Sequence, residues 1–124
     1  MFSLHTEALA WLRYARHMPL CATETGYYAD VLGLNTSMCI EVEIKKSVSD
    51  LRAEFKNKVP KILTYSGGVG RDTPNFFYYL VPWEIAEKSL EIVKEKFPKA
   101  GLAAVRYPSL KGWMVGKNIT VLKK

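Results

Sequence analysis

The run from Phe76 to Val81 constrains the fold of this 124-residue chain more than any other stretch. All of its residues are aromatic or aliphatic, and Asn75 and Pro82 bound it. A short apolar run between such residues predicts a strand that is buried on both faces. A strand of this kind needs a covering layer on each side of its sheet, so the sequence predicts an α/β domain.

Two amphipathic helices flank this strand in the sequence. The first runs from Ser47 to about Lys58, and Ser47 caps it with Asp50 at the third position, in a variant of the capping box. The second runs from Glu84 to Phe97, and a short strand from Leu102 to Arg106 follows it. Because a helix joins the last two strands, we expect these strands to pair in parallel.

The N-terminal part predicts antiparallel pairing instead. A helix from Ser3 to about His17 carries an apolar face. A strand from Tyr27 to Leu34 is then joined to one from Met38 to Lys46 by a short turn, as in a hairpin. With a terminal meander from Tyr107 to Lys124, the whole chain is predicted to form one α/β domain, residues 1–124, in which helices flank a mixed β-sheet.

Composition bears on the partners and the compartment. The net charge is +6, and basic residues concentrate from Lys45 to Lys61 and from Lys94 onward, which suggests a polyanionic partner such as DNA, although a soluble basic domain has the same composition. Cys21 and Cys39 show neither a disulfide framework nor a zinc-ligand spacing. No segment approaches the ~20 apolar residues of a membrane span. We therefore expect a cytoplasmic protein with no disulfide and no membrane segment.

The strand from Met38 to Lys46 carries an unusual row of charge. Ile40, Val42 and Ile44 alternate with the other residues and share one face. The opposite face holds Cys39 and a row of three charged residues, namely Glu41, Glu43 and Lys45. Charged side chains in a row on such an apolar strand need a chemical reason.

Two further carboxylates lie on apolar elements. Glu7 falls on the inner face of the first helix, where burial is costly without a partner. Asp30 falls in the first strand of the hairpin, whose short turn fixes the register and brings Asp30 near Glu43. Converging carboxylates repel one another, and a hard divalent cation such as Mg²⁺ or Mn²⁺ relieves the repulsion. With Lys45 able to hold a water molecule, this set indicates metal-assisted hydrolysis of a phosphodiester.

These residues also match a known pattern. Asp30, followed after twelve residues by Glu43-Ile44-Lys45, resembles the signature of the PD-(D/E)XK nuclease superfamily. The stretch from Glu43 to Lys58 resembles the "Glu-x-Lys, Ser, Asp-Leu, acid, Lys" segment of MmcB-like DNA repair proteins. The resemblance covers about Glu7 to Arg106. It departs from the superfamily at Ala29, where the pattern has a proline.

The resemblance implies a restriction-endonuclease-like core, in αβββαβ order with an inserted helix. It implies a metal-dependent endo- or exonuclease that hydrolyses DNA in repair, recombination or the processing of phage and mobile-element DNA. In this pattern Glu7, Asp30 and Glu43 are metal ligands, the backbone carbonyl of Ile44 is a further ligand, and Lys45 orients the attacking water. Glu41, on the same face, is an additional candidate ligand.

Basic residues near this motif are candidates for phosphate contact. Those at the end of the Ser47–Lys58 helix also suit the helix dipole, so the two roles stay open. The candidate nucleic-acid contacts are Lys46, Arg52, Lys56, Lys58, Lys61 and Arg71. A homodimer is a further possibility, because one small nuclease domain often needs a second copy to cut both strands.

Two other functions remain open at this point. The same fold without catalysis would be a DNA-binding or repair-complex module with vestigial acids. The charged strand would alternatively form a surface ladder of cross-strand pairs in a protein-interaction domain. The first alternative predicts DNA binding without metal-dependent cutting, and the second predicts neither.

Overall fold

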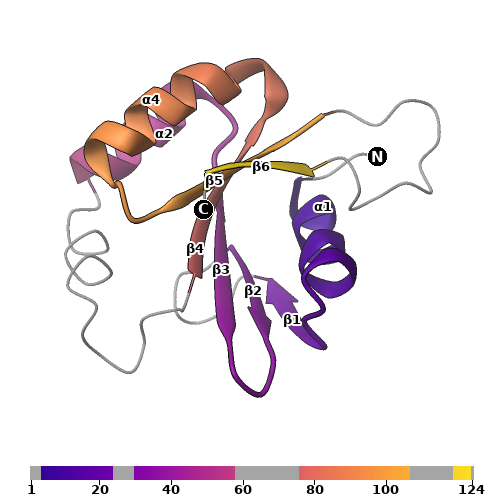
Figure 1. Cartoon of the computed structure of the whole chain (residues 1–124). Helices are drawn as coiled ribbons and strands as arrows, with labels where there is room; N and C mark the ends of the chain where they lie inside the picture. The colour runs from indigo at the N-terminus through magenta and orange to yellow at the C-terminus, as the bar shows by residue number, and fades with distance from the viewer. Residues whose placement is uncertain (1–3, 24–29, 58–75, 107–118, 124) are drawn as a thin grey trace.

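A computed structural model of the chain describes residues 4–23, 30–57, 76–106 and 119–123 (Figure 1). The described elements follow the chain in this order: α1 (Leu4–Ala10), the π-helical turn η1 (Trp11–Ala15), β1 (Leu20–Thr23), β2 (Val31–Leu34), β3 (Cys39–Ile44), α2 (Val48–Asn57), β4 (Phe76–Pro82), the 3-10 turn η2 (Trp83–Ile85), α4 (Ala86–Lys96), β5 (Gly101–Val105) and β6 (Ile119–Lys123).

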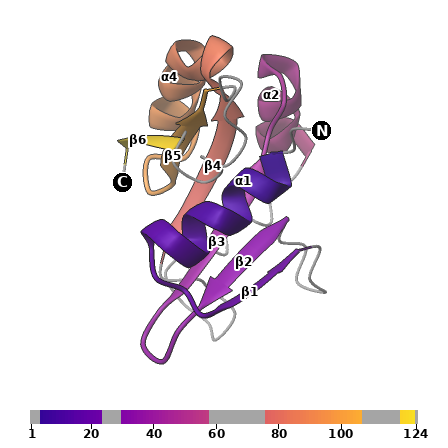
Figure 2. The ribbon, with the colours of Figure 1, turned by 90° about the vertical axis from the view of Figure 1, so that its right-hand side faces the viewer.

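The described strands form one six-stranded mixed sheet in the order β1-β2-β3-β4-β5-β6. β1, β2 and β3 pair antiparallel, β3, β4 and β5 pair in parallel, and β6 pairs antiparallel with β5. Helix α1 lies on one face of this sheet, and α2 and α4 lie side by side on the other (Figures 1 and 2). The prediction of a mixed sheet with helices on both sides is confirmed.

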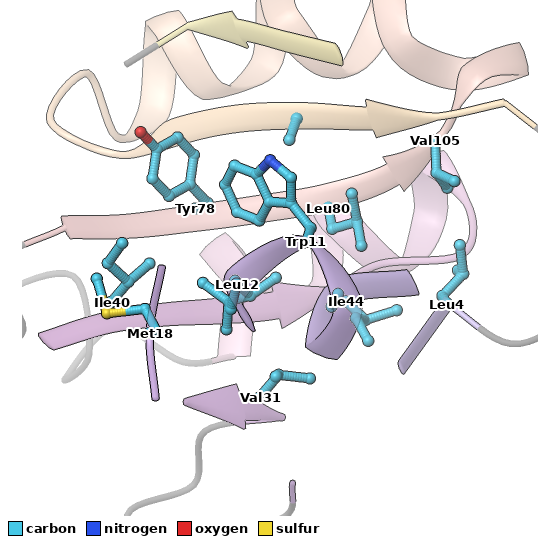
Figure 3. Close-up of a cluster of buried hydrophobic side chains, with 13 residues drawn as sticks. Leu4, Trp11, Leu12, Met18, Val31, Ile40, Ile44, Tyr78, Leu80 and Val105 are labelled. Atoms are coloured by element: carbon cyan, nitrogen blue, oxygen red, sulfur yellow. The ribbon is translucent and has the colours of Figure 1, made fainter. Parts of the chain in front are cut away.

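The central strand β4 supplies side chains to two cores. Tyr78 and Leu80 point toward α1, where the Trp11 ring meets the Tyr78 ring edge-on with centroids 5.3 Å apart (Figure 3). Phe77 and Tyr79 point the other way, into the core under α2 and α4. Residues from Phe77 to Pro82 are all buried, as a strand covered on both faces requires.

The hairpin and the start of α2 form as their sequences predict. The Asn35 side chain accepts a hydrogen bond from the Ser37 amide at 2.9 Å, which fixes the turn between β2 and β3. Ser47 Oγ accepts from the Asp50 amide at 3.1 Å, and Asp50 Oδ2 accepts from the Lys46 amide at 3.2 Å. The capping box is therefore present, although its return bond reaches the residue before the cap.

Other predicted boundaries differ from the structure. The first helix is α-helical only to Ala10 and continues as a π-turn in which the Arg16 amide reaches the Trp11 carbonyl at 3.0 Å. His17 then has a φ of 57°, which turns the chain into β1, a strand that the sequence analysis missed. Residues 27–29 of the predicted Tyr27–Leu34 strand and most of the terminal meander lie outside the described residues.

Two further findings concern the cysteines and the helices. Cys21 and Cys39 are both in the thiol form and are not joined in a disulfide. Among the described residues, no helix is long and apolar enough to cross a membrane.

Gly101 provides a test of how tightly β4 and β5 pack. A Cβ atom at Gly101 would lie 2.5 Å from two carbons of the buried Tyr78 ring, whereas one at Gly33 would lie 3.1 Å from the Met18 side chain. We expect Gly101→Ala to lower the free energy of unfolding by about 3 kcal/mol and Gly33→Ala by about 1 kcal/mol. Urea denaturation of both variants measures the difference. Equal stability of Gly101→Ala and the wild type would contradict this packing.

Candidate active site

The charged face of β3 lies inside the protein rather than in solvent. Ile40, Val42 and Ile44 pack toward α1, and the alternate residues face α2 and α4. Glu41 is 2% exposed, and Glu43 and Lys45 are each 4% exposed. The predicted alternation is therefore confirmed, and both of its faces are covered.

Lys45 lies between two carboxylates. Its Nζ atom is 3.8 Å from Glu43 Oε2 and 3.7 Å from Glu54 Oε1. Glu54 comes from α2 and is 1% exposed. A charged side chain that is buried away from water needs oppositely charged and hydrogen-bonding partners. The two ion pairs of Lys45 therefore connect the end of β3 to α2.

Tyr79 of β4 completes this group. Its hydroxyl donates a hydrogen bond to Glu54 Oε2 at 3.2 Å. Burial raises the pKa of Tyr79 above its usual value, and the negative charges of Glu54, Glu43 and Glu41 raise it further. The phenol therefore stays protonated and acts as a donor to Glu54. We call Glu43, Lys45, Glu54 and Tyr79 the buried charge cluster.

Asp30 lies directly before β2, near the end of β3. The pairing of Val31 with Val42 places the preceding residue, Asp30, across from Glu43. Asp30 Oδ2 accepts a hydrogen bond from the Ile44 amide at 2.8 Å, so a side chain takes the place of a strand carbonyl there. In such a strand the amide and the carbonyl of one residue point to the same neighbour, so the Ile44 carbonyl is directed to the Asp30 side.

These oxygen atoms suit a hard divalent cation. Asp30 and Glu43 supply carboxylates and Ile44 supplies a carbonyl, and Mg²⁺ typically takes one or two carboxylates and keeps several waters. Within the described residues, no group of three or more His, Cys, Asp or Glu is arranged to hold a metal ion. A site here therefore depends on two carboxylates, the carbonyl and water.

The other predicted acids, Glu7 and Glu41, lie elsewhere. Glu7 is fully buried in α1, the helix that covers the face opposite to Glu43. Glu41 pairs across the sheet with Phe77, whereas Glu43 pairs with Tyr79 nearer the strand end. Burial raises the pKa of the Cys39 thiol, and the negative charge of Glu41 raises it further. Glu41 therefore influences Cys39, at the start of β3.

The described basic residues of the predicted nucleic-acid set lie on the surface. Lys46, Arg52 and Lys56 are all exposed. Arg52 and Lys56 line an open groove of about 360 Å³ between α2 and α4, together with Phe55, Lys88, Glu91, Ile92, Glu95 and Lys96. The predicted contacts Lys58, Lys61 and Arg71 lie outside the described residues.

The sequence analysis did not single out Glu54 or Tyr79 as site residues. Glu54 lies three residues after the buried Leu51, on the inner face of α2, which was a usable signal. A tyrosine inside an apolar strand likewise needs a partner for its hydroxyl. Neither signal names the partner, because the two residues are 25 positions apart in the chain.

Comparisons with known proteins place the chain by its fold alone. It is an α/β protein with a mixed sheet flanked by helices. No family model matches the chain, and no curated protein matches its sequence. Among solved structures, it is similar to a protein of unknown function from Silicibacter pomeroyi, with 16% identity and a TM-score of 0.61 over 97% of this chain and 67% of that one. This likeness shows a shared fold.

The Tyr79 hydroxyl has a predictable effect on stability. We expect Tyr79→Phe to lower the free energy of unfolding by about 1–2 kcal/mol at neutral pH, because Glu54 loses this donor. A raised folded-state pKa stabilises the protein fully below the unfolded value of 10.0, and this contribution declines as the pH rises above it. The deficit of the variant should therefore shrink above about pH 10.

Urea denaturation across this pH range measures the effect. Tyr14→Phe is the matched control, since Tyr14 is 71% exposed and should change stability little at any pH. A deficit of Tyr79→Phe that is constant through pH 10 and above would contradict the role of the phenol.

Proposed function

We propose that this chain is a metal-dependent nuclease of the PD-(D/E)XK type, with a restriction-endonuclease-like core, that hydrolyses DNA phosphodiester bonds. One observation carries the proposal. Asp30, directly before β2, accepts a hydrogen bond from the Ile44 amide next to Glu43, and Lys45 follows Glu43 on the same face of β3. Two carboxylates and an ammonium in this relation are the equipment for metal-assisted phosphodiester hydrolysis.

The arrangement of elements supports the same proposal. Helix α1, the antiparallel strands β1 to β3, and then α2 leading into the parallel strand β4 agree with the core order implied by the resemblance. The site lies at the carboxyl end of β3, and open α/β sheets bind ligands at the carboxyl ends of their parallel strands.

Each residue then has a role in the reaction. Asp30, Glu43 and the Ile44 carbonyl would hold Mg²⁺ or Mn²⁺, and the bound ion would supply Lewis-acid activation of the phosphate and of water. The Ile44 amide holds one oxygen of Asp30, so the orientation of this carboxylate is fixed before substrate arrives. Lys45 orients the attacking water and offsets the negative charge that develops on the phosphate.

Glu54 and Tyr79 act as positioning residues for Lys45. A lysine side chain has many rotamers, and fixing one of them near the scissile phosphate lowers the entropic part of the barrier. Glu54 holds the ammonium beside Glu43, and the Tyr79 hydroxyl holds Glu54. The ammonium is therefore in place without a contact from the substrate.

DNA as the substrate follows from charge and from the resemblance. The chain has a net charge of +6, and Lys46 follows the motif directly at the end of β3. Sequence-independent binding through phosphates weakens steeply with salt. Whether the protein acts as a homodimer belongs to the same proposal and is tested by the mass of the DNA complex.

Removing the motif charges should abolish cutting. We expect Glu43→Gln and Lys45→Ala to reduce Mg²⁺- or Mn²⁺-dependent cleavage of linear DNA by about 100-fold or more. Lys94→Ala is the matched control, because Lys94 is an exposed lysine of α4 whose removal should leave the rate unchanged. Initial rates on labelled DNA measure the effect, and circular dichroism checks that each variant folds.

Two outcomes would reject this assignment. A folded Lys45→Ala or Glu43→Gln protein that cuts at the wild-type rate would show that these residues are not catalytic. A wild-type protein that binds DNA but never cuts it with Mg²⁺ or Mn²⁺ would favour the alternative, a catalytically inactive DNA-binding or repair-complex module.

Metal binding is tested separately from cutting. We expect Mn²⁺ to bind the wild-type protein without DNA. Asp30→Asn should lower the affinity of the protein for Mn²⁺ at least about tenfold, because the substitution removes one charged ligand. Titration calorimetry with Mn²⁺ measures both affinities. Asp50→Asn, which changes an exposed carboxylate at the start of α2, is the control and should bind Mn²⁺ as the wild type does. Equal affinity of Asp30→Asn and the wild type would remove Asp30 from the ligand set.

A further inference from the structure

An exposed tryptophan and an arginine stack on each other at one end of the sheet. The guanidinium carbon of Arg106 lies 4.0 Å from the centroid of the Trp83 ring. Trp83 is 37% exposed, whereas Trp11 is 4% exposed and belongs to the core. Arg106 is exposed as well. Exposure of apolar indole surface to water costs free energy. A solvent-exposed Trp–Arg pair is therefore a candidate for binding another planar group.

The pair lies at the same end of the sheet as the candidate active site, where the parallel strands finish. Pro82 of β4 pairs with Val105 of β5, so Trp83 and Arg106 are the next residues of two neighbouring strands. β3 runs parallel to both strands and finishes at the same end of the sheet, where the Lys45 amide donates a hydrogen bond to the Leu80 carbonyl at 3.0 Å. Ile44 pairs with Leu80, so Lys45 lies across from Val81, and Trp83 follows Val81 by two residues at the same end of the sheet.

The pair follows directly on two strands of the face that carries the catalytic candidates. Phe77, Tyr79 and Val81 of β4 pack toward α2 and α4, and Trp83 comes two residues after Val81 as the first residue of η2. Leu102 and Ala104 of β5 pack toward the same helices, and Arg106 follows the end of β5. A ligand on the Trp83–Arg106 pair would thus lie at the end of the sheet at which Glu43 and Lys45 lie.

We propose that Trp83 and Arg106 form a stacking site for an unpaired nucleobase, which places single-stranded or frayed DNA in the candidate active site. This inference rests on the proposed nuclease function for the choice of ligand. Aromatic rings and guanidinium planes both stack on bases, and every base has a flat face, so such a site is tolerant of sequence. A base inside a duplex has both faces covered by its neighbours, so the site selects DNA in which a base is exposed.

The exposed charges at this end of the sheet balance one another. Lys46 and Arg106 supply positive charge for the phosphates beside the base. Glu84 and Glu87 are exposed near the start of α4 and supply as many negative charges. The preference for a base should therefore come from stacking, and it should persist at salt concentrations that weaken phosphate contacts.

The test compares two ligands of equal charge. Oligothymidine and an abasic oligomer of the same length are titrated in EDTA, so no cleavage occurs. We expect the wild-type protein to bind oligothymidine about tenfold more tightly than the abasic oligomer, as one stacked base predicts. Trp83→Ala should remove this ratio and leave the affinity for the abasic oligomer nearly unchanged.

Conservative variants separate stacking from a general structural effect. Trp83→Tyr should recover most of the preference for oligothymidine, because it retains an aromatic face. Arg106→Lys keeps the charge but loses the plane, so it should reduce the preference. Tyr14→Ala removes an exposed aromatic side chain elsewhere and should have no effect. Quenching of tryptophan fluorescence by oligothymidine should be present in the wild type and diminished in Trp83→Tyr.

Several results would overturn the inference. They are equal binding of the two ligands by the wild type, an equal loss for both ligands in Trp83→Ala, and no loss for either ligand. These readings are independent of cutting. A protein that cuts DNA but shows no preference for bases refutes the stacking site alone, and one that prefers bases but never cuts refutes the nuclease alone.

Discussion

The placement of Lys45 between Glu43 and Glu54 is the interaction on which the rest of this structure depends. An ammonium that is 4% exposed is stable only with partners held close to it. One partner comes from its own strand and the other from α2, so α2 must lie over the end of β3. Tyr79 then ties the same helix to β4. One ion therefore determines how three successive elements of the chain pack.

This dependence explains why the two faces of the sheet differ in kind. The side under α1 packs mainly apolar and aromatic side chains, among them Trp11, Tyr78 and Ile40, and its buried acid is Glu7 of α1. The face under α2 and α4 combines the aromatic rings of Phe77, Tyr79 and Phe97 with buried acids at one end. Replacing a buried ionic group with apolar residues is often neutral or stabilising, so stability alone does not account for it. The proposed nuclease function gives these buried charges a role.

Sequence patterns correctly predicted those parts of the protein that depend on residues close together in the chain. The alternation in β3, the hydrogen bonds of Asn35 and Ser47, and the burial of β4 each depend on residues a few positions apart. The strand register that places Asp30 opposite Glu43 followed from one short turn. β1 is only four residues long, and a π-turn with a left-handed His17 precedes it, so no periodicity marks it. Glu54 and Tyr79 meet only through tertiary packing.

The hydrogen bond from the Ile44 amide to Asp30 has a consequence for the sheet itself. Within the described residues, β2 pairs with β3 through backbone groups as far as Val31 and Val42, and then a carboxylate takes over. In the part of the chain that the structure describes, the tip of β3 is thus joined to the β2 side by a side chain. Backbone groups that are left unpaired in a sheet can pair with another strand. Here the Asp30 carboxylate already occupies the Ile44 amide, so the same hydrogen bond also protects this amide from pairing with a further strand.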